Sequence, residues 1–77
     1  MTGYYPRWAE LSGLVERAIS ERKGKKKFSD LTYYFVDFFL GSAKAEAVAE
    51  VIRDHGYLAR VVAKPDNSVW YVYVRRK

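Results

Sequence analysis

The sequence has no cysteine and only one histidine, two prolines and five glycines among its 77 residues. Without cysteine, disulfide cross-links, thiolate zinc sites, iron–sulfur ligation and a thiol nucleophile are all excluded. Long apolar runs are also absent, since the longest one covers residues 33–40 and is interrupted by Asp37. Such a run is too short to cross a bilayer and lies in the wrong place for a signal peptide. We therefore expect a cytoplasmic protein that does not contact a membrane.

The sequence does contain enough apolar material for one small core. Hydrophobic residues make up 49% of the chain and aromatic residues 17%, far above the content of disordered chains. Surface scaling for a chain of this length buries roughly 63% of the unfolded surface, which permits a single core. We expect a single domain over residues 1–77, with a short tail at 1–5 and a basic loop at 22–28.

Positive charge is concentrated in two short stretches. Lysine and arginine total 14 against 9 acidic residues, which gives a formal net charge of +5. The two stretches hold eight of these cations: Arg22, Lys23, Lys25, Lys26, Lys27, Arg75, Arg76 and Lys77. The 6 cations that remain of the 14 are outnumbered by the 9 anions. A basic patch on an otherwise mildly acidic domain favours a polyanionic partner, although lysines in a loop or at a terminus also serve solubility.

Hydrophobic periodicity predicts two helices. Apolar residues recur at helical spacing over 8–19, which indicates a helix that begins at Pro6 and stops before Gly24. A second, alanine-rich helix begins at Ser42, a residue type that caps helix N-termini, and Gly56 ends it.

Three segments are predicted to be strands. Residues 31–40 also fit a helical stripe, but Thr, Tyr, Phe and Val side chains fit a pleated surface better, and Gly41 ends the run. Residues 57–64 and 69–76 form two more strands, joined by the turn residues 65–68. The element order is αβαββ, and the fold class is α+β.

This order predicts a three-stranded mixed sheet with two helices. A right-handed crossover makes the first two strands parallel. The last strand is the most apolar, so it fits between them, in the split βαβ arrangement of half a ferredoxin-like fold. Its C-terminal end then lies beside the basic loop, with Arg60 at the same end of the sheet. The predicted phosphate-binding patch consists of Arg22, Lys23, Lys25, Lys26, Lys27, Arg60, Arg75, Arg76 and Lys77.

Alternation along the strands places aromatic side chains on one face of the sheet. The face that points away from the second helix is predicted to carry Tyr33, Phe35, Asp37, Phe39, Tyr71 and Tyr73, flanked by Arg60, Lys64 and Arg75. Rings on which bases stack, beside cations that hold phosphates, are what binding of single-stranded RNA or DNA needs. Two alternatives stay open: the first helix covers this face, or a second copy of the chain does.

Two family resemblances accompany this pattern. Exposed aromatic residues on central strands resemble the RNA-recognition motif, which implies RNA binding, but the Lys/Arg-Gly-Phe/Tyr signature of that family is absent. The segment 33–74, with Gly41-Ser42 before an alanine-rich helix and Gly56-Tyr57 after it, resembles the sporulation-related (SPOR) module, which implies peptidoglycan binding. The sequence is assigned to neither family.

The sequence shows no convincing pattern of catalytic or metal-binding residues. His55 is the only histidine and fits the C-terminus of a helix, where a cation is favoured. No glycine-rich phosphate loop is present, and a carboxylate-based nuclease site at Asp30 or Asp37 is the remaining catalytic alternative. We therefore expect a non-catalytic protein, without cofactor or metal, that binds RNA or DNA, with RNA slightly favoured by the tyrosines. The alternative is a protein-interaction or homo-oligomerisation module, for example a homodimer or a component of a ribonucleoprotein.

Overall fold

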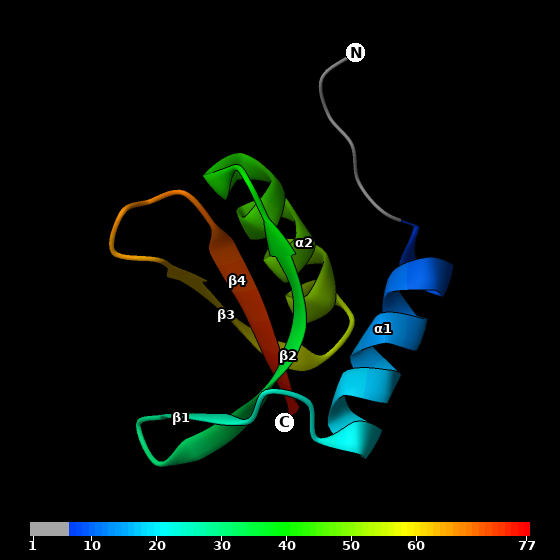
Figure 1. Cartoon of the computed structure of the whole chain (residues 1–77). Coiled ribbons are helices and arrows are strands. Elements are labelled where there is room, and N and C mark those ends of the chain that lie inside the picture. Colours follow the sequence, from blue (N-terminus) through cyan, green and yellow to red (C-terminus); the bar gives the residue numbers. More distant parts are fainter. Residues whose placement is uncertain (1–6) are drawn as a thin grey trace.

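The computed structural model describes residues 7–77, so the predicted tail at 1–5 and the predicted helix start at Pro6 lie outside the described residues. Its elements are α1 (Trp8–Glu21), β1 (Lys26–Phe28), β2 (Leu31–Phe39), α2 (Ser42–Asp54), β3 (Tyr57–Ala63) and β4 (Trp70–Arg76) (Figure 1). The α+β class is confirmed, and five of these elements correspond to the predicted helices and strands.

The sheet has four strands in the order β1-β2-β4-β3, and every neighbouring pair is antiparallel. The prediction of three strands in a mixed sheet is therefore wrong in both respects. β2 and β3 run parallel to each other without pairing, because β4 lies between them. This central position of β4 is the one predicted from its apolar sequence.

The additional strand, β1, lies inside the predicted basic loop. It pairs with residues 31–33 of β2, so that Ser29 and Asp30 form a two-residue hairpin turn. Both turn residues have positive φ, 50° and 68°, as a type I′ turn requires. Aspartate tolerates this left-handed region, but Ser-Asp is a much weaker turn signal than Asn-Gly. A basic run followed by a weak signal therefore does not identify the strand.

A bulge in β2 changes which side chains share a face. The pairing register with β4 shifts between Phe35 and Asp37. After the shift, Phe38 lies opposite Tyr71, whereas Phe39 packs against the core. The assignment of Phe39 to the aromatic side of the sheet is therefore wrong, because an inserted residue reverses which side chains after it point to each face of the sheet.

Both helices pack on the same face of the sheet. α1 lies mainly against β2 and β4, and α2 against β3 and β4. The shared core is formed by Leu11, Val15 and Ala18 of α1, Ala45, Val48, Ala49 and Ile52 of α2, and Val36, Ala59, Val72 and Val74 of the sheet. The alternative in which the first helix covers the aromatic face is therefore wrong. Within residues 7–77, no helix is long and apolar enough to cross a membrane.

Polar and aromatic contacts attach α1 to the rest of the domain. The Glu16 carboxylate accepts hydrogen bonds from the Tyr57 hydroxyl and, at 2.8 Å, from the Arg76 guanidinium. The Trp8 ring stacks on the His55 ring with 3.9 Å between the centroids. These contacts join α1 to the start of β3, the end of β4 and the end of α2.

The helix ends differ in detail from the prediction. α1 ends at Glu21, and the C-cap residue Arg22 adopts the left-handed region with φ 52°, before the predicted stop at Gly24. Gly41, and not Ser42, occupies the N-cap position of α2, and no side chain caps this end. The N-terminus of α2 is therefore held by packing of its apolar stripe rather than by a capping hydrogen bond.

Candidate nucleic-acid interface

The two basic stretches of the chain meet at one end of the sheet. β4 is antiparallel to β2 and Val74 lies opposite Tyr34, so the residues after Val74 reach the start of β2. Next to this pair, the Phe35 amide donates a hydrogen bond to the Lys23 carbonyl at 2.8 Å. The segment that leads into β1 therefore lies against β2 close to the C-terminus (Figure 1).

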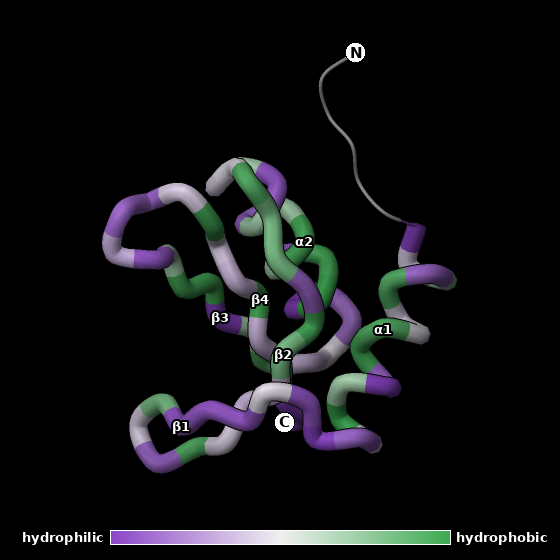
Figure 2. The backbone as a smooth tube through the Cα atoms, in the orientation of Figure 1, coloured by the Kyte–Doolittle hydropathy of each residue, from purple (hydrophilic) through white to green (hydrophobic). Residues whose placement is uncertain are grey.

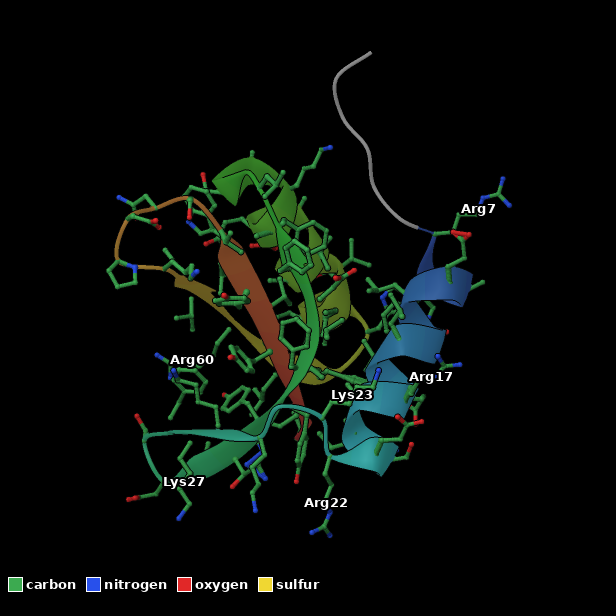
Figure 3. The ribbon with its side chains drawn as sticks, in the orientation of Figure 1. Arg7, Arg17, Arg22, Lys23, Lys27 and Arg60 are labelled. Atoms are coloured by element: carbon green, nitrogen blue, oxygen red, sulfur yellow. The ribbon has the colours of Figure 1, made fainter. Side chains whose placement is uncertain are left out.

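Most of the predicted phosphate-binding side chains are exposed, and those of the two basic stretches lie along this end. Arg60, predicted at the same end, instead lies in the middle of β3, opposite Tyr73, and its guanidinium lies over the Phe28 ring of the hairpin. We call the whole set the basic rim. Its members are Arg22, Lys23, Lys25, Lys26, Lys27, Arg60, Arg76 and Lys77, which are exposed, and Arg75, which is half-buried. The backbone between α1 and β1 is mostly hydrophilic, with one near-neutral stretch (Figure 2), and Lys27 and Arg60 lie on the opposite side of the sheet from α1 (Figure 3). Among these members, Arg76 is the one that forms an ion pair within residues 7–77, with Glu16, and an exposed pair of this kind contributes only about 0–1 kcal/mol.

A row of four residues crosses the sheet at the level of Lys23. The Lys23 carbonyl is bonded to Phe35, Phe35 lies opposite Tyr73, and Tyr73 lies opposite Arg60. The ring of Phe35 is 6.0 Å from that of Tyr73 and 5.9 Å from that of Tyr71, in edge-to-face geometry. Basic residues therefore end the row on both sides, with aromatic residues between them.

Phe28 of β1 extends this aromatic surface and is a residue that the sequence analysis missed. Its ring centroid lies 5.3 Å from that of Tyr33 and 5.5 Å from that of Tyr73. The Arg60 guanidinium lies 4.8 Å from the centre of the Phe28 ring, and the Lys26 ammonium 5.8 Å from it. The β1–β2 hairpin thus curls over the sheet, and two cations of the basic rim make cation–π contacts there.

The four predicted stacking residues differ in accessibility. Tyr33 is only 5% exposed, so its ring supports Phe28 and offers no face to a base. Phe35, Tyr71 and Tyr73 are half-buried. Desolvation, with a smaller contribution from Tyr71, raises the pKa of Tyr73, which therefore stays a neutral phenol at physiological pH. Phe35 and Tyr71 are the better placed of the predicted residues for contact with a ligand.

Phe38 is a further exposed ring on the same side. It lies opposite Tyr71 and is 52% exposed. The sequence analysis missed it because the bulge, and not simple alternation, turns it to this side. We call the surface formed by Phe28, Phe35, Phe38, Tyr71 and Tyr73 the aromatic face.

The described part of the chain offers no metal centre. Among residues 7–77, no three histidine, cysteine, aspartate or glutamate side chains gather closely enough to hold a metal ion. The His55 ring is stacked on Trp8, and its Nδ1 lies 2.9 Å from the Val51 carbonyl oxygen. Asp37 accepts a hydrogen bond from the backbone amide of Phe38 at 2.8 Å. Comparisons with protein-family models, with curated proteins and with solved structures find no significant match, so a function has to be inferred from the basic rim and the aromatic face.

Proposed function

We propose that this chain is a small, non-catalytic protein that binds single-stranded nucleic acid. The observation that carries the proposal is the arrangement of the sheet: both helices occupy one face, and the opposite face presents half-buried rings directly beside the basic rim. A strand crossing this surface would meet cations from the segment before β1, then Phe35 and Tyr71, then Arg60.

The cations supply most of the affinity in this proposal. Each phosphate neutralised by lysine or arginine releases condensed counterions, which makes binding favourable and sensitive to salt. Exposed lysines on a hairpin suit this role, because their long side chains can follow a backbone of variable conformation. Gathering many like charges at one end of a small domain costs free energy unless an anion is bound there.

The aromatic rings are the reason why we propose a single strand, and not a duplex, as the ligand. Bases in a duplex are already stacked on one another, whereas bases in a single strand have free faces. A base stacked on an aromatic side chain contributes about 1–3 kcal/mol. RNA is slightly favoured over DNA, because a tyrosine hydroxyl can exchange hydrogen bonds with the ribose 2′-hydroxyl.

The test is fluorescence anisotropy with labelled 12-nucleotide single strands of RNA and DNA over a range of salt concentrations. If four to six phosphates are neutralised, log affinity falls with log salt at a slope of about −3 to −4. The double variant Lys26→Ala/Lys27→Ala should reduce the magnitude of the slope by about 1.4. An affinity that does not change with salt concentration, or no binding at about 50 mM salt, contradicts the proposal.

A control of matched charge comes from the far side of α1. Arg7 and Arg17 are exposed and point away from the sheet (Figure 3). The double variant Arg7→Ala/Arg17→Ala removes the same net charge as the lysine pair but lies away from the basic rim. It should leave the slope unchanged, and an equal loss in both double variants would mean that net charge alone drives binding.

One observation favours a second function, a protein-interaction or homo-oligomerisation module. Two large apolar side chains at the end of β2 are strongly exposed, Phe38 at 52% and Leu40 at 75%. Exposed apolar side chains that lie together are typical of interaction sites. Light scattering separates the functions: a dimer that Phe38→Ser/Leu40→Ser converts to a monomer supports this alternative, and a monomer at all concentrations argues against self-association.

A further inference from the structure

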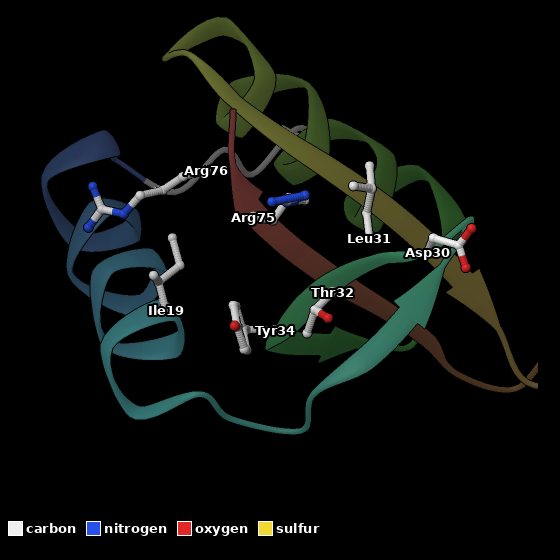
Figure 4. A pocket seen from close by; sticks show the side chains of 7 residues that line it. All are labelled: Ile19, Asp30, Leu31, Thr32, Tyr34, Arg75 and Arg76. Atoms are coloured by element: carbon white, nitrogen blue, oxygen red, sulfur yellow. The ribbon is translucent and has the colours of Figure 1, made fainter.

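A pocket lies at the point where β2 separates from the end of β4. It has a volume of about 360 Å³ and is lined by Ile19, Asp30, Leu31, Thr32, Tyr34, Arg75 and Arg76 (Figure 4). The hairpin turn, the start of β2, the end of α1 and the end of β4 all contribute to it. Its volume is in the lower part of the ~300–1,000 Å³ range of small-molecule sites, which suits a ligand the size of one nucleotide.

Arg75 contributes a buried donor atom, without a hydrogen-bond partner in the described residues, to the wall of this pocket. Its Nε atom is buried and makes no hydrogen bond within the described chain, residues 7–77. Arg76, by contrast, is turned toward α1 (Figure 4) and is bound by Glu16. A buried guanidinium donor without an acceptor is costly. The Nε atom itself is enclosed by the protein, so an anionic oxygen of a ligand would bind the terminal nitrogens of this half-buried side chain.

Asp30 contributes a negatively charged group to the same pocket. Its carboxylate forms no ion pair with any residue between 7 and 77, including Arg75. A carboxylate only accepts hydrogen bonds, so it selects ligands that present N–H donors. Thr32 adds a hydroxyl, and Tyr34 and Ile19 add flat and apolar surface on which a base could rest.

We propose that this pocket binds one nucleotide of the single strand, with the phosphate on Arg75 and the Watson–Crick edge of the base on Asp30. Guanine fits best, because its N1–H and exocyclic N2–H₂ are adjacent donors that one carboxylate can accept together. Uracil offers a single N–H between two carbonyl oxygens, which a carboxylate repels. This inference rests on the proposed function, since the pocket would take its nucleotide from a strand held by the basic rim.

The test uses the full chain labelled with ¹⁵N and two probes, guanosine 5′-monophosphate and uridine 5′-monophosphate. The guanosine nucleotide should shift the amide signals of residues 30–34 and 75–76 and bind about 5–150-fold more tightly, the range that one bidentate base contact supplies. Asp30→Asn should abolish this preference while keeping the turn, because asparagine also tolerates the left-handed conformation that Asp30 adopts. Arg75→Gln should weaken binding of the guanosine nucleotide but leave that of guanosine, which has no phosphate, unchanged; Arg17→Ala serves as the control.

Two oligonucleotides then distinguish this inference from the proposed function. One is all uridine, and the other carries a single guanosine in the same uridine sequence. Tighter binding of the second, lost in Asp30→Asn, supports the pocket. Equal binding of both, with no shift at residues 30–34, overturns the pocket and leaves the proposed function intact. Binding of the free guanosine nucleotide without binding of either oligonucleotide overturns the proposed function, and with it the assignment of the pocket to a strand.

Discussion

Gly24 is a position where both the backbone and a neighbour exclude a side chain. Its φ is +46°, and a Cβ atom built there would lie 2.8 Å from the Cβ of Phe35. Gly24→Ala should therefore lower the free energy of unfolding by about 1–3 kcal/mol, since the segment before β1 has to move away from β2. Urea denaturation measures this loss directly.

Gly13 provides the matched control for that substitution. It lies inside α1, and a Cβ atom built there meets nothing within 4 Å. Gly13→Ala should stabilise the protein by about 0.5–1 kcal/mol, because alanine loses less backbone entropy in a helix. If both variants shift stability in the same direction, the close approach of Gly24 to Phe35 is not what determines the effect.

Tyr57 should make stability depend on alkaline pH. Its hydroxyl donates to Glu16, and this hydrogen bond, followed by desolvation and the Glu16 charge, raises its pKa above the usual value of about 10. A raised pKa means that the folded state holds the proton more tightly than the unfolded state. The stabilisation is therefore fully present below the unfolded pKa of about 10 and is lost as pH rises through the folded pKa.

The measurement compares urea unfolding of the wild type and Tyr57→Phe between pH 7 and 11. The wild type should be the more stable at neutral pH, and its advantage should shrink above about pH 10. Every other group that titrates in this range is present in both proteins, so the difference between them isolates Tyr57. Two parallel curves over the whole range would show that the hydrogen bond to Glu16 does not hold the proton.

At the level of elements, the β1–β2 hairpin depends on Phe28. The ring packs on Tyr33 and Tyr73 and lies under Arg60. Phe28→Ala should destabilise the protein by about 1–3 kcal/mol, less than the loss for a fully buried phenylalanine because the ring is half-buried. Lys27→Ala, an exposed neighbour in the same strand, should stay within about 0.5 kcal/mol of the wild type. Thermal unfolding of both variants decides whether the hairpin is held by this ring.

The elements that periodicity predicts well are those with unbroken patterns. α2 has an uninterrupted apolar stripe, and β4 has an uninterrupted apolar run, so their approximate extents and the central position of β4 followed from the sequence. The strand β1 did not follow from the sequence, because three residues, two lysines and a phenylalanine, are too few to show a period. The bulge between Phe35 and Asp37 also leaves no signal, and it alone decides that Phe38, and not Phe39, is exposed. Long-range pairing and inserted residues are tertiary effects that local patterns do not encode.

At the scale of the whole molecule, the position of α1 decides whether a ligand face exists. An amphipathic helix before a three-stranded unit can pack on either side of the sheet, and the sequence left both sides open. The structure places it beside α2, where Glu16 meets Tyr57 and Arg76. The basic residues of the two distant stretches then lie at one end, next to a face that neither helix covers. The candidate site is thus a consequence of the packing of α1 and not of any local motif.

One pair of variants tests whether the aromatic rings bind bases while the cations bind phosphates. Tyr71→Ala removes a ring of the aromatic face, so binding of a 12-nucleotide single strand should weaken by about 5–150-fold, the equivalent of one lost stack. Binding of a duplex of the same length should hardly change, because its bases are not free to stack on protein. Lys26→Ala/Lys27→Ala should weaken both ligands, since both carry phosphates. Anisotropy at one fixed salt concentration measures the affinities of the wild type and of both variants for the two ligands, with thermal unfolding to show that each variant is folded. If Tyr71→Ala weakens the duplex and the single strand equally, the aromatic face does not contact bases, and the basic rim alone accounts for binding.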